Sequence, residues 1–369
     1  MKPEPAPEMQ HGVVRFYNFL PLGNPFLEAV LAGFSRLQKA IAPGFFFDAQ
    51  GARLFAALCE QPGYYLLRTE VGILRQNMAA ILQFIGAGVE LIEFRAGIGV
   101  QAAVLAEQLR PLVYVPVDLD GGILERASRE LAELYPWLNI SGMRADVKRS
   151  LVLPKFAGLP IRRKLAFLPG AMIGSFAPEE AVAVLQNARR LVGAGGVLLA
   201  SVDAGKGREE LESAYNDAGG LNARMHLNLL ARINRELGGD FQSGRFSYRA
   251  DCDSALGLVS MRIESRYAQF AHVAGRRFDF APGEALETGI ACQYSDEQFQ
   301  AMAQRAGFAL DSIWTDAAQR FSIYGMIATR CTDADTGVRF WSRFTALHDG
   351  SSLCGGAVDP RQSGLTFTA

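Results

Sequence analysis

Short apolar strands alternate with helices along residues 90–202, and this alternation constrains the fold more than any other feature of the chain. The predicted strands cover residues 90–95, 112–117, 138–141, 164–168 and 196–202. The helical patterns between them cover residues 100–109, 121–134 and 178–191. Strands separated by helices of this length pair in parallel through right-handed crossovers, with helices on both faces of the sheet. The sequence therefore predicts an α/β fold with a parallel sheet.

The alternation ends after Asp203, where a second type of structure begins. Residues 207–237 have a polar-rich helical pattern, and residues 244–280 contain period-two stretches typical of antiparallel strands. We therefore expect an added lobe. Before the alternation begins, helical patterns cover residues 25–40, 52–60 and 69–86. The predicted parts of the chain are a flexible N-terminal arm (1–25), an N-terminal helical part of the lobe (26–86), the parallel-sheet core (87–206), the inserted lobe segment (207–295), a closing helix and strands of the core (296–331) and an irregular tail (332–369).

Composition and charge exclude several classes of protein. The chain of 369 residues has a net charge of −1, so it lacks the basic surface of a nucleic-acid binder. No apolar run approaches the ~20 residues that cross a bilayer, and Met1–Gln10 lacks the apolar core of a signal peptide. The five cysteines contain no C-x-x-C pair, and the four histidines have no metal-ligand spacing. We expect a monomeric cytoplasmic protein without a metal site, a nucleic-acid partner or a membrane span.

Three strand ends of the predicted sheet carry residues suited to a nucleotide-like cofactor. The first strand runs into a loop with Gly97 and Gly99, and glycines there let the backbone approach a ligand closely. The second strand ends at Asp118, which can bind both hydroxyls of a ribose, and the third is followed by Asp146, which can hold an adenine edge. The G-x-G-x-x-G motif of nicotinamide enzymes is absent. This order of glycine loop and two acids favours a class I (Rossmann-like) methyltransferase that uses S-adenosylmethionine (SAM).

Longer strings of sequence point to one family. The chain resembles the histidine-specific Nα-methyltransferases of ergothioneine biosynthesis across roughly residues 44–330. The strings that carry the resemblance are F-F-F-D at 45–48, L-F-A-A-L-C-E-Q-P-G-Y-Y-L-L-R-T-E at 54–70, Y-V-P-V-D at 114–118, F-L-P-G-A-M-I-G-S-F-A-P-E-E-A at 167–181 and A-Y-N-D-A-G-G-L-N-A-R-M-H-L-N-L-L-A-R-I-N-R-E-L at 214–237. The resemblance implies a SAM methyltransferase fold with a second α+β substrate lobe, made from the N-terminal segment and the insertion after the fifth strand.

The resemblance also implies roles for particular residues. Tyr64 matches a tyrosine near the cofactor and the substrate, Tyr215 matches a tyrosine of the substrate pocket, and Gly170 matches a glycine at the reaction centre. We expect the two tyrosines to orient the substrate. The positions implied for the SAM site are Glu93, Arg95, Gly97, Gln101, Asp118, Asp146 and Val147. The positions implied for the amine or amino-acid substrate are Phe47, Phe55, Ser175, Ser265, Gly289 and Ala291.

The glycine loop departs from the family pattern E-L-G-S-G-T-S-x-K at two positions. Arg95 stands where the family has its first glycine, and Gln101 stands where it has a lysine. The long side chain of Arg95 can close the methionine end of the cofactor site, turn outward, or pair with the cofactor carboxylate in place of the lost lysine. A guanidinium is well shaped for such a bidentate contact.

The substrate pocket departs further. Ser175 replaces an asparagine that holds the substrate amine, and Phe47 replaces a tyrosine. Gly289 and Ala291 replace a glutamate and a serine that contact the imidazole of histidine, and Ser265 aligns with a methionine. A polar substrate group buried without a partner costs about 1–3 kcal/mol, so these losses predict that histidine is not the substrate. The replacements are small, which favours a larger or more apolar amine, for instance an indole amino acid.

Three functions therefore remain open from the sequence. The first is an active N-methyltransferase with an altered substrate, in which the protein aligns an amine with a methyl group that is already activated. The second is a non-catalytic descendant that binds a ligand. The replacements at Arg95 and Gln101 in the cofactor loop are the reason to consider it. The third is an enzyme that uses SAM for a different transfer.

Overall fold

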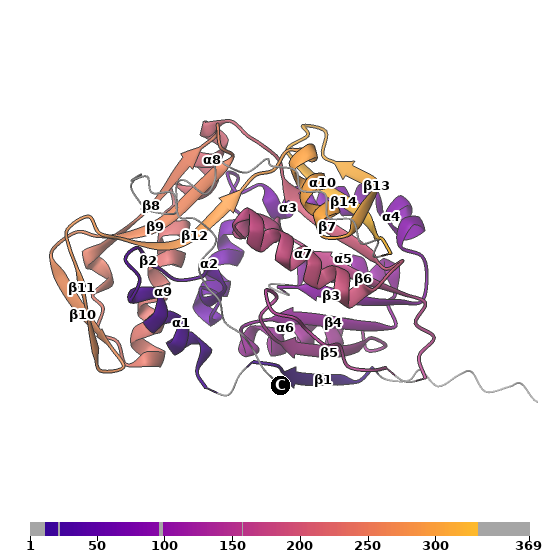
Figure 1. The fold of residues 1–369 in the computed structure, drawn as a ribbon, viewed down its shortest axis with the longest axis horizontal. Coiled ribbons are helices and arrows are strands. Elements are labelled where there is room, and N and C mark those ends of the chain that lie inside the picture. Colours follow the sequence, from indigo (N-terminus) through magenta and orange to yellow (C-terminus); the bar gives the residue numbers. More distant parts are fainter. Residues whose placement is uncertain (1–11, 21–22, 96–98, 157, 331–369) are drawn as a thin grey trace, which may run out of the picture. The chain divides into compact units, whose positions relative to one another are not determined.

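A computed structural model describes residues 12–20, 23–95, 99–156 and 158–330 of the chain. The predicted tail at 332–369, residues 1–11 and 21–22 of the predicted arm, and Gly97 lie outside the described residues. Figure 1 shows two lobes, one built around a large sheet and the other around a smaller sheet with a long helix beside it.

The large sheet has eight strands in the order β1-β5-β4-β3-β6-β7-β14-β13. Their bounds are β1 Val14–Asn18, β3 Val89–Phe94, β4 Val113–Asp118, β5 Asn139–Arg144, β6 Arg163–Leu168, β7 Val197–Asp203, β13 Phe308–Thr315 and β14 Phe321–Ala328. The first six strands in this order pair in parallel, whereas β14 pairs antiparallel with both β7 and β13. This arrangement confirms the predicted Rossmann-like α/β class.

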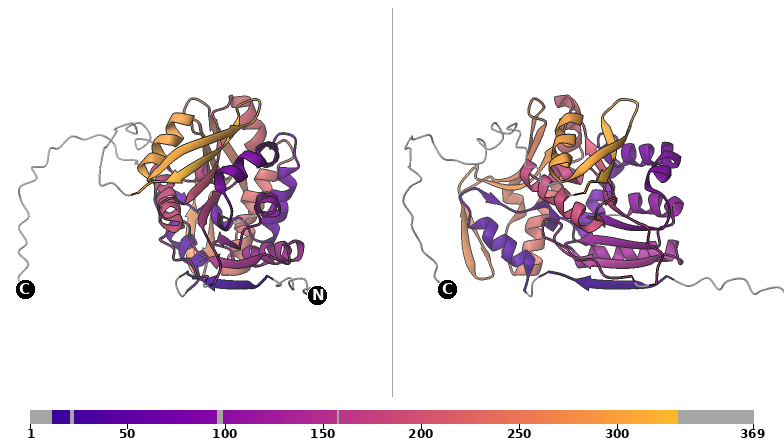
Figure 2. Two further views of the ribbon diagram at one scale, coloured as in Figure 1. Left: turned by 90° about the vertical axis from the view of Figure 1, so that its right-hand side faces the viewer. Right: turned by 45° about the vertical axis from the view of Figure 1, so that its right-hand side comes forward.

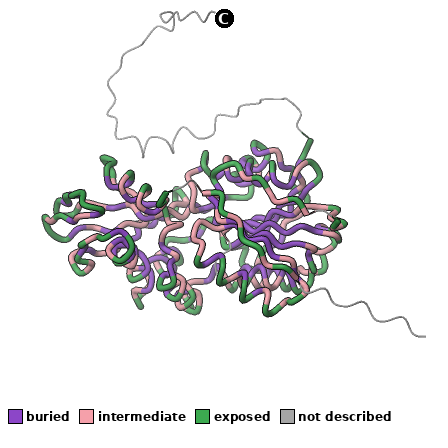
Figure 3. The backbone as a smooth tube through the Cα atoms, turned by 90° about the horizontal axis from the view of Figure 1, so that it is seen from below, coloured by how far each residue is buried: buried purple, intermediate pink, exposed green. Residues whose placement is uncertain are grey.

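Helices flank both faces of this sheet (Figures 1 and 2), and its central strands are correspondingly apolar. The helices are α3 Leu66–Gln76, α4 Met78–Ile85, α5 Val100–Leu109, α6 Gly121–Leu134, α7 Pro178–Val192 and α10 Asp296–Arg305. Every residue of β3 and β7 is buried, as expected for strands covered on both faces. Figure 3 shows this buried core running through the sheet. The side chain of Asp120 caps α6, and Ser295 begins α10 with a capping box.

The second lobe has its own sheet and its own core. Its sheet has the order β2-β12-β9-β8, and a hairpin of β10 and β11 extends from it. The elements are α1 Pro25–Phe34, β2 Lys39–Ala40, α2 Ala49–Cys59, α8 Arg208–Tyr215, α9 Leu221–Leu237, β8 Phe246–Asp253, β9 Leu258–Ser265, β10 Gln269–Val273, β11 Arg276–Phe280 and β12 Ala285–Cys292. Phe34, Phe241 and Phe280 contact one another inside this lobe, with ring centroids 5.6–6.0 Å apart.

Three local predictions are wrong. Val14–Asn18 belongs to the sheet as β1 rather than to a flexible arm, because it pairs in parallel with β5. The first helix ends at Phe34 instead of reaching Ala40, since Lys39–Ala40 pairs with β12 and Gly33 packs against the Ala40 backbone too closely for a side chain. The helix expected at 69–86 is two helices, which separate at Asn77.

Candidate active site

A cavity of about 190 Å³ opens where the carboxyl ends of β3, β4 and β7 face α2, α9, β9 and β12 of the second lobe. This is the edge at which open α/β sheets bind ligands. The structure brings most of the sequence-predicted site residues together on its wall. Those that line it are Phe47, Phe55, Tyr64, Glu93, Arg95, Gln101, Asp118, Gly170, Ser175, Tyr215 and Ala291.

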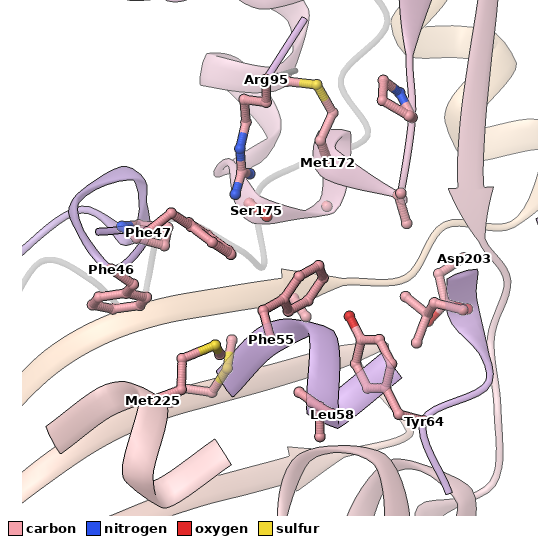
Figure 4. A pocket seen from close by; sticks show the side chains of 18 of the residues that line it. Phe46, Phe47, Phe55, Leu58, Tyr64, Arg95, Met172, Ser175, Asp203 and Met225 are labelled. Atoms are coloured by element: carbon pink, nitrogen blue, oxygen red, sulfur yellow. The ribbon is translucent and has the colours of Figure 1, made fainter. Parts of the chain in front are cut away.

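Arg95 follows β3 and enters the cavity. Figure 4 shows its guanidinium extending toward Ser175 and the ring of Phe47, and it lies 5.9 Å from the centroid of that ring. The outward orientation that the sequence left open is therefore wrong. Its φ of 56° lies in the left-handed region, which suits the glycine found there in the resembled family and costs an L-residue about 1 kcal/mol.

Glu93 lies almost fully buried at the end of β3 and also lines the cavity. Its carboxyl group accepts a short hydrogen bond from the hydroxyl of Tyr114. Burial, together with the nearby Glu70 and Asp118 carboxylates, raises the pKa of Glu93 to about 8. Glu93 therefore keeps its proton in the ligand-free protein near neutral pH, and a cation bound beside it would favour its charged form.

Glu70 on α3 was not identified from the sequence, although it ends the family string at 54–70. It is fully buried and accepts hydrogen bonds from Gln101 Nε2 (3.0 Å), the backbone N–H of Gly170 (3.0 Å) and the hydroxyl of Ser201. Burial raises its pKa above the ordinary value. Through these hydrogen bonds, Glu70 connects helix α5, which carries Gln101, with the turn after β6, which carries Gly170.

The carboxyl ends of β4 and β5 hold the two predicted acids. Asp118 lines the cavity, and its Oδ1 accepts the backbone N–H of Asp120 at 2.9 Å. Asp146 and Val147 follow β5 and do not line the cavity. Asp146 accepts the backbone N–H of Lys148, while the Val147 carbonyl accepts a hydrogen bond from Asn187. Their role toward an adenine stays a prediction.

A tight turn after β6 places Gly170 and Ser175 beside the second lobe. Gly170 has a φ of 65°, and its N–H points to Glu70, so the turn needs a glycine here. The following 3₁₀ helix, Met172–Ser175, packs so closely on β12 that a Cβ on Gly174 would lie 2.4 Å from the carbonyl oxygen of Cys292. This contact holds Ser175 against the cavity.

Aromatic rings form one side of the cavity (Figure 4). Phe47 contacts Phe55 edge to face at 5.3 Å, and Phe55 contacts Tyr64 at 5.9 Å. Burial raises the pKa of Tyr64 and of Tyr215 above the ordinary value, so both phenols stay neutral at physiological pH. They can therefore orient a substrate by hydrogen bonds.

The structure corrects one substrate residue. Ser265 does not line the cavity: it ends β9, and its hydroxyl donates to the Tyr267 carbonyl while Gln269 donates to it. Met261, four residues earlier on β9, lines the cavity instead and lies opposite Gly289 in the ladder with β12. Gly289 itself lies just behind this wall, where an added Cβ would meet Met261 Cε at 3.5 Å.

Two further residues on the wall were missed. Asp203 ends β7 as Asp118 ends β4, so its position at a strand end was an available signal. It accepts hydrogen bonds from Tyr65 (2.9 Å), Gln293 (3.0 Å) and Lys206. His226 on α9 carried no such signal, since a single histidine on an apolar helix face is ordinary.

The donor set fits SAM. The sulfonium of SAM is a cation, and Glu93 and Asp118 supply acidic groups at the cavity wall, with Arg95 as a counterpart for a carboxylate.

No group of three or more potential metal ligands occurs among the described residues. None of the helices in the described ranges is both long and apolar enough to cross a membrane.

Known proteins match the chain over most of its length. The model of a family described as histidine-specific, SAM-dependent methyltransferases matches residues 26–328. Histidine N-alpha-methyltransferase of Mycolicibacterium smegmatis is 32% identical over 80% of this chain and 92% of that protein. N-methyltransferase fsqC of Aspergillus fumigatus is 24% identical over 72% of this chain and 73% of its own length. For 4-dimethylallyltryptophan N-methyltransferase easF of Claviceps purpurea, the identity is 21% over 80% of this chain and 93% of that protein. The chain therefore belongs to the histidine-specific methyltransferase family and is a SAM-dependent N-methyltransferase.

Proposed function

We propose that the protein methylates the nitrogen of an amino acid or small amine that is larger and less polar than histidine. The observation that carries this proposal is the wall built by β9 and β12. Met261, Ile290 and Ala291 line that wall, and Gly289 stands behind Met261. In the resembled family the positions of Gly289 and Ala291 hold a carboxylate and a hydroxyl for the imidazole, so this wall offers histidine neither group.

The opposite wall favours a flat apolar side chain. Phe47, Phe55 and Phe46 line the cavity, and aromatic rings pair favourably at centroid separations of about 4.5–7 Å. The name of one relative supports this direction, since easF is named for 4-dimethylallyltryptophan, a substituted indole amino acid.

The residues of this chain have a limited chemical task. SAM supplies a methyl group that its sulfonium already activates, so the protein must hold an uncharged amine nitrogen in line with that methyl and exclude water. Tyr64, Tyr215 and Ser175 line the cavity, and their hydroxyls can hold the amine by hydrogen bonds. Gly170 has no side chain, so the substrate can approach the backbone closely at the same edge of the cavity.

We further propose that Arg95 binds a carboxylate at the methionine end of SAM. It enters the cavity beside Ser175, and burial lowers its pKa below the ordinary value while the Asp118 charge opposes that shift. A guanidinium nevertheless stays protonated in proteins, so Arg95 offers a positive charge there. An arginine that closed the site instead would prevent SAM from binding.

A substrate screen tests the proposal. The protein is incubated with SAM and single amines, including histidine, tryptophan, phenylalanine, tyrosine and tryptamine, and methylated products are measured by mass spectrometry. The proposal expects methylation of at least one aromatic amine at a kcat/KM well above that for histidine. Efficient methylation of histidine, with no aromatic amine accepted, contradicts it. Formation of another product from SAM would show a different transfer.

A further inference from the structure

The imidazole of His226 lies on the second-lobe side of the cavity. His226 lines the cavity from α9 and is only 1% exposed. Its ring contacts Phe46 at a centroid distance of 4.7 Å and Tyr248 at 4.6 Å. The residues that mark the SAM side, Glu93 and Asp118, belong to the edge of the large sheet instead. His226 therefore faces the part of a substrate that points away from the reacting methyl group.

The hydrogen bonds around His226 determine which ring nitrogen carries the proton. His226 Nδ1 lies 2.7 Å from Thr288 Oγ1, and Thr288 Oγ1 lies 3.1 Å from the carbonyl oxygen of Met261. A carbonyl oxygen only accepts, so the single hydroxyl proton of Thr288 points to Met261. Thr288 Oγ1 must then accept from His226, which places the proton on Nδ1. Nε2 then carries the lone pair. The hydrogen bonds of the described residues include none to Nε2, and it is not one of their fully enclosed unpaired polar atoms, so it is open to the cavity that His226 lines.

This imidazole is a neutral acceptor rather than a base. Burial lowers the pKa of His226 to about 3, so the ring is uncharged across the physiological range. An α-amine has a pKa of about 8, and a group with a pKa of about 3 cannot take its proton to a useful extent. Nε2 can instead recognise the substrate by accepting a hydrogen bond from it.

We propose that His226 is a specificity-determining residue, whose Nε2 accepts a hydrogen bond from an N–H or O–H group on the aromatic side chain of the substrate. The inference rests on the proposed function and narrows it to amines that carry a ring donor, such as indoles and phenols. A ligand without such a donor would leave a buried acceptor unpaired, and that loss discriminates strongly between otherwise similar substrates. Thr288 precedes Gly289 on β12, so the acceptor lies beside the position that lost its carboxylate.

Pairs of isosteric amines test this inference. Tryptophan is compared with 3-benzothienylalanine, in which sulfur replaces the ring N–H, and tyrosine is compared with phenylalanine. Dissociation constants are measured by calorimetry with the S-adenosylhomocysteine-saturated protein. We expect the natural protein to prefer the donor-bearing member of at least one pair about 10- to 100-fold. In His226→Phe, which keeps an aromatic ring and removes the acceptor, the preference should fall to within about threefold.

The His226→Gln variant, which retains an acceptor oxygen, should keep part of the preference. Binding of S-adenosylhomocysteine to both variants reports that they are folded, and if the phenylalanine variant does not fold, the comparison of His226→Met with the natural protein replaces it. Equal binding within both pairs by the natural protein overturns the inference and leaves the proposed function standing. A preference that persists undiminished in the acceptor-free variant also overturns it. If S-adenosylhomocysteine binds but no aromatic amine does, the proposed function itself fails.

Discussion

Gly289 lies directly opposite Met261 in the antiparallel ladder between β12 and β9, at the point where the ladder carries a bulge. The thioether of Met261 forms part of the cavity wall, and a Cβ on Gly289 would touch Met261 Cε at an ordinary van der Waals distance of 3.5 Å. A side chain at position 289 would therefore reach the cavity past Met261. The missing side chain removes a polar contact from the substrate wall and leaves space there.

Restoring the polar groups should restore histidine binding. We expect the double variant Gly289→Glu with Ala291→Ser to bind histidine at least about tenfold more tightly than the natural protein, because a charge-assisted hydrogen bond contributes about 1.5–3 kcal/mol. Calorimetry in the presence of S-adenosylhomocysteine measures the change. Gly289→Gln with Ala291→Ser is the matched control without the added charge. Unchanged histidine affinity in the double variant would show that these positions do not contact the side chain of the substrate.

Arg95 should stabilise bound SAM at a cost to the unliganded protein. Arg95→Gly relieves a left-handed conformation, so we expect the free energy of unfolding of the ligand-free protein to rise by about 1 kcal/mol. The same change should weaken S-adenosylhomocysteine binding about 10- to 100-fold, since it removes a charged partner for the carboxylate. Arg95→Lys keeps the charge and should lose less. Tighter binding by the glycine variant would mean that Arg95 obstructs the cofactor site.

Glu70 should be required for the geometry of the reaction centre. Its carboxylate accepts from Gln101, Gly170 and Ser201, and Glu70→Ala leaves these three buried donors unpaired. We expect a loss of about 2–4 kcal/mol in the free energy of unfolding, measured by urea denaturation. Glu70→Gln should lose less, because its amide oxygen still accepts. A change below about 0.5 kcal/mol for the alanine variant would contradict the predicted role.

The buried Glu93 should make the ligand-free protein less stable as pH rises. The folded protein keeps the Glu93 proton to about pH 8, whereas the unfolded chain releases it near the ordinary value of 4.5. The unfolded chain therefore binds fewer protons between these values, and the free energy of unfolding falls with increasing pH, by at most about 1.4 kcal/mol per unit. Urea denaturation at several pH values measures this slope. Glu93→Gln should flatten it, and an unchanged slope in that variant would assign the effect to other groups.

The sheet and its ligand edge could be predicted because their physical signals are local. Strands buried on both faces are continuous apolar runs, and the acids that follow them, such as Asp118, stand out at their ends. Strand β1 was not predicted because it lies at the edge of the sheet and three of its five residues are exposed, so it has no apolar run.

The substrate wall could not be predicted with the same accuracy, because it depends on the register between distant strands. The pairing of Met261 with Gly289 is set by the β9–β12 ladder and its bulge. Because the sequence does not show this register, it pointed to Ser265 instead. The contact of His226 with Thr288 joins residues 62 positions apart. Neither contact leaves a periodic or compositional trace in the sequence.

The most direct test of the altered pocket is a comparison of binding affinities. The protein, saturated with S-adenosylhomocysteine, is titrated by calorimetry with histidine and, separately, with tryptophan and tyrosine. We predict that at least one aromatic amine binds at least tenfold more tightly than histidine. Histidine binding with the highest affinity of the set, undiminished despite Gly289 and Ala291, would contradict the claim that this pocket has diverged from histidine.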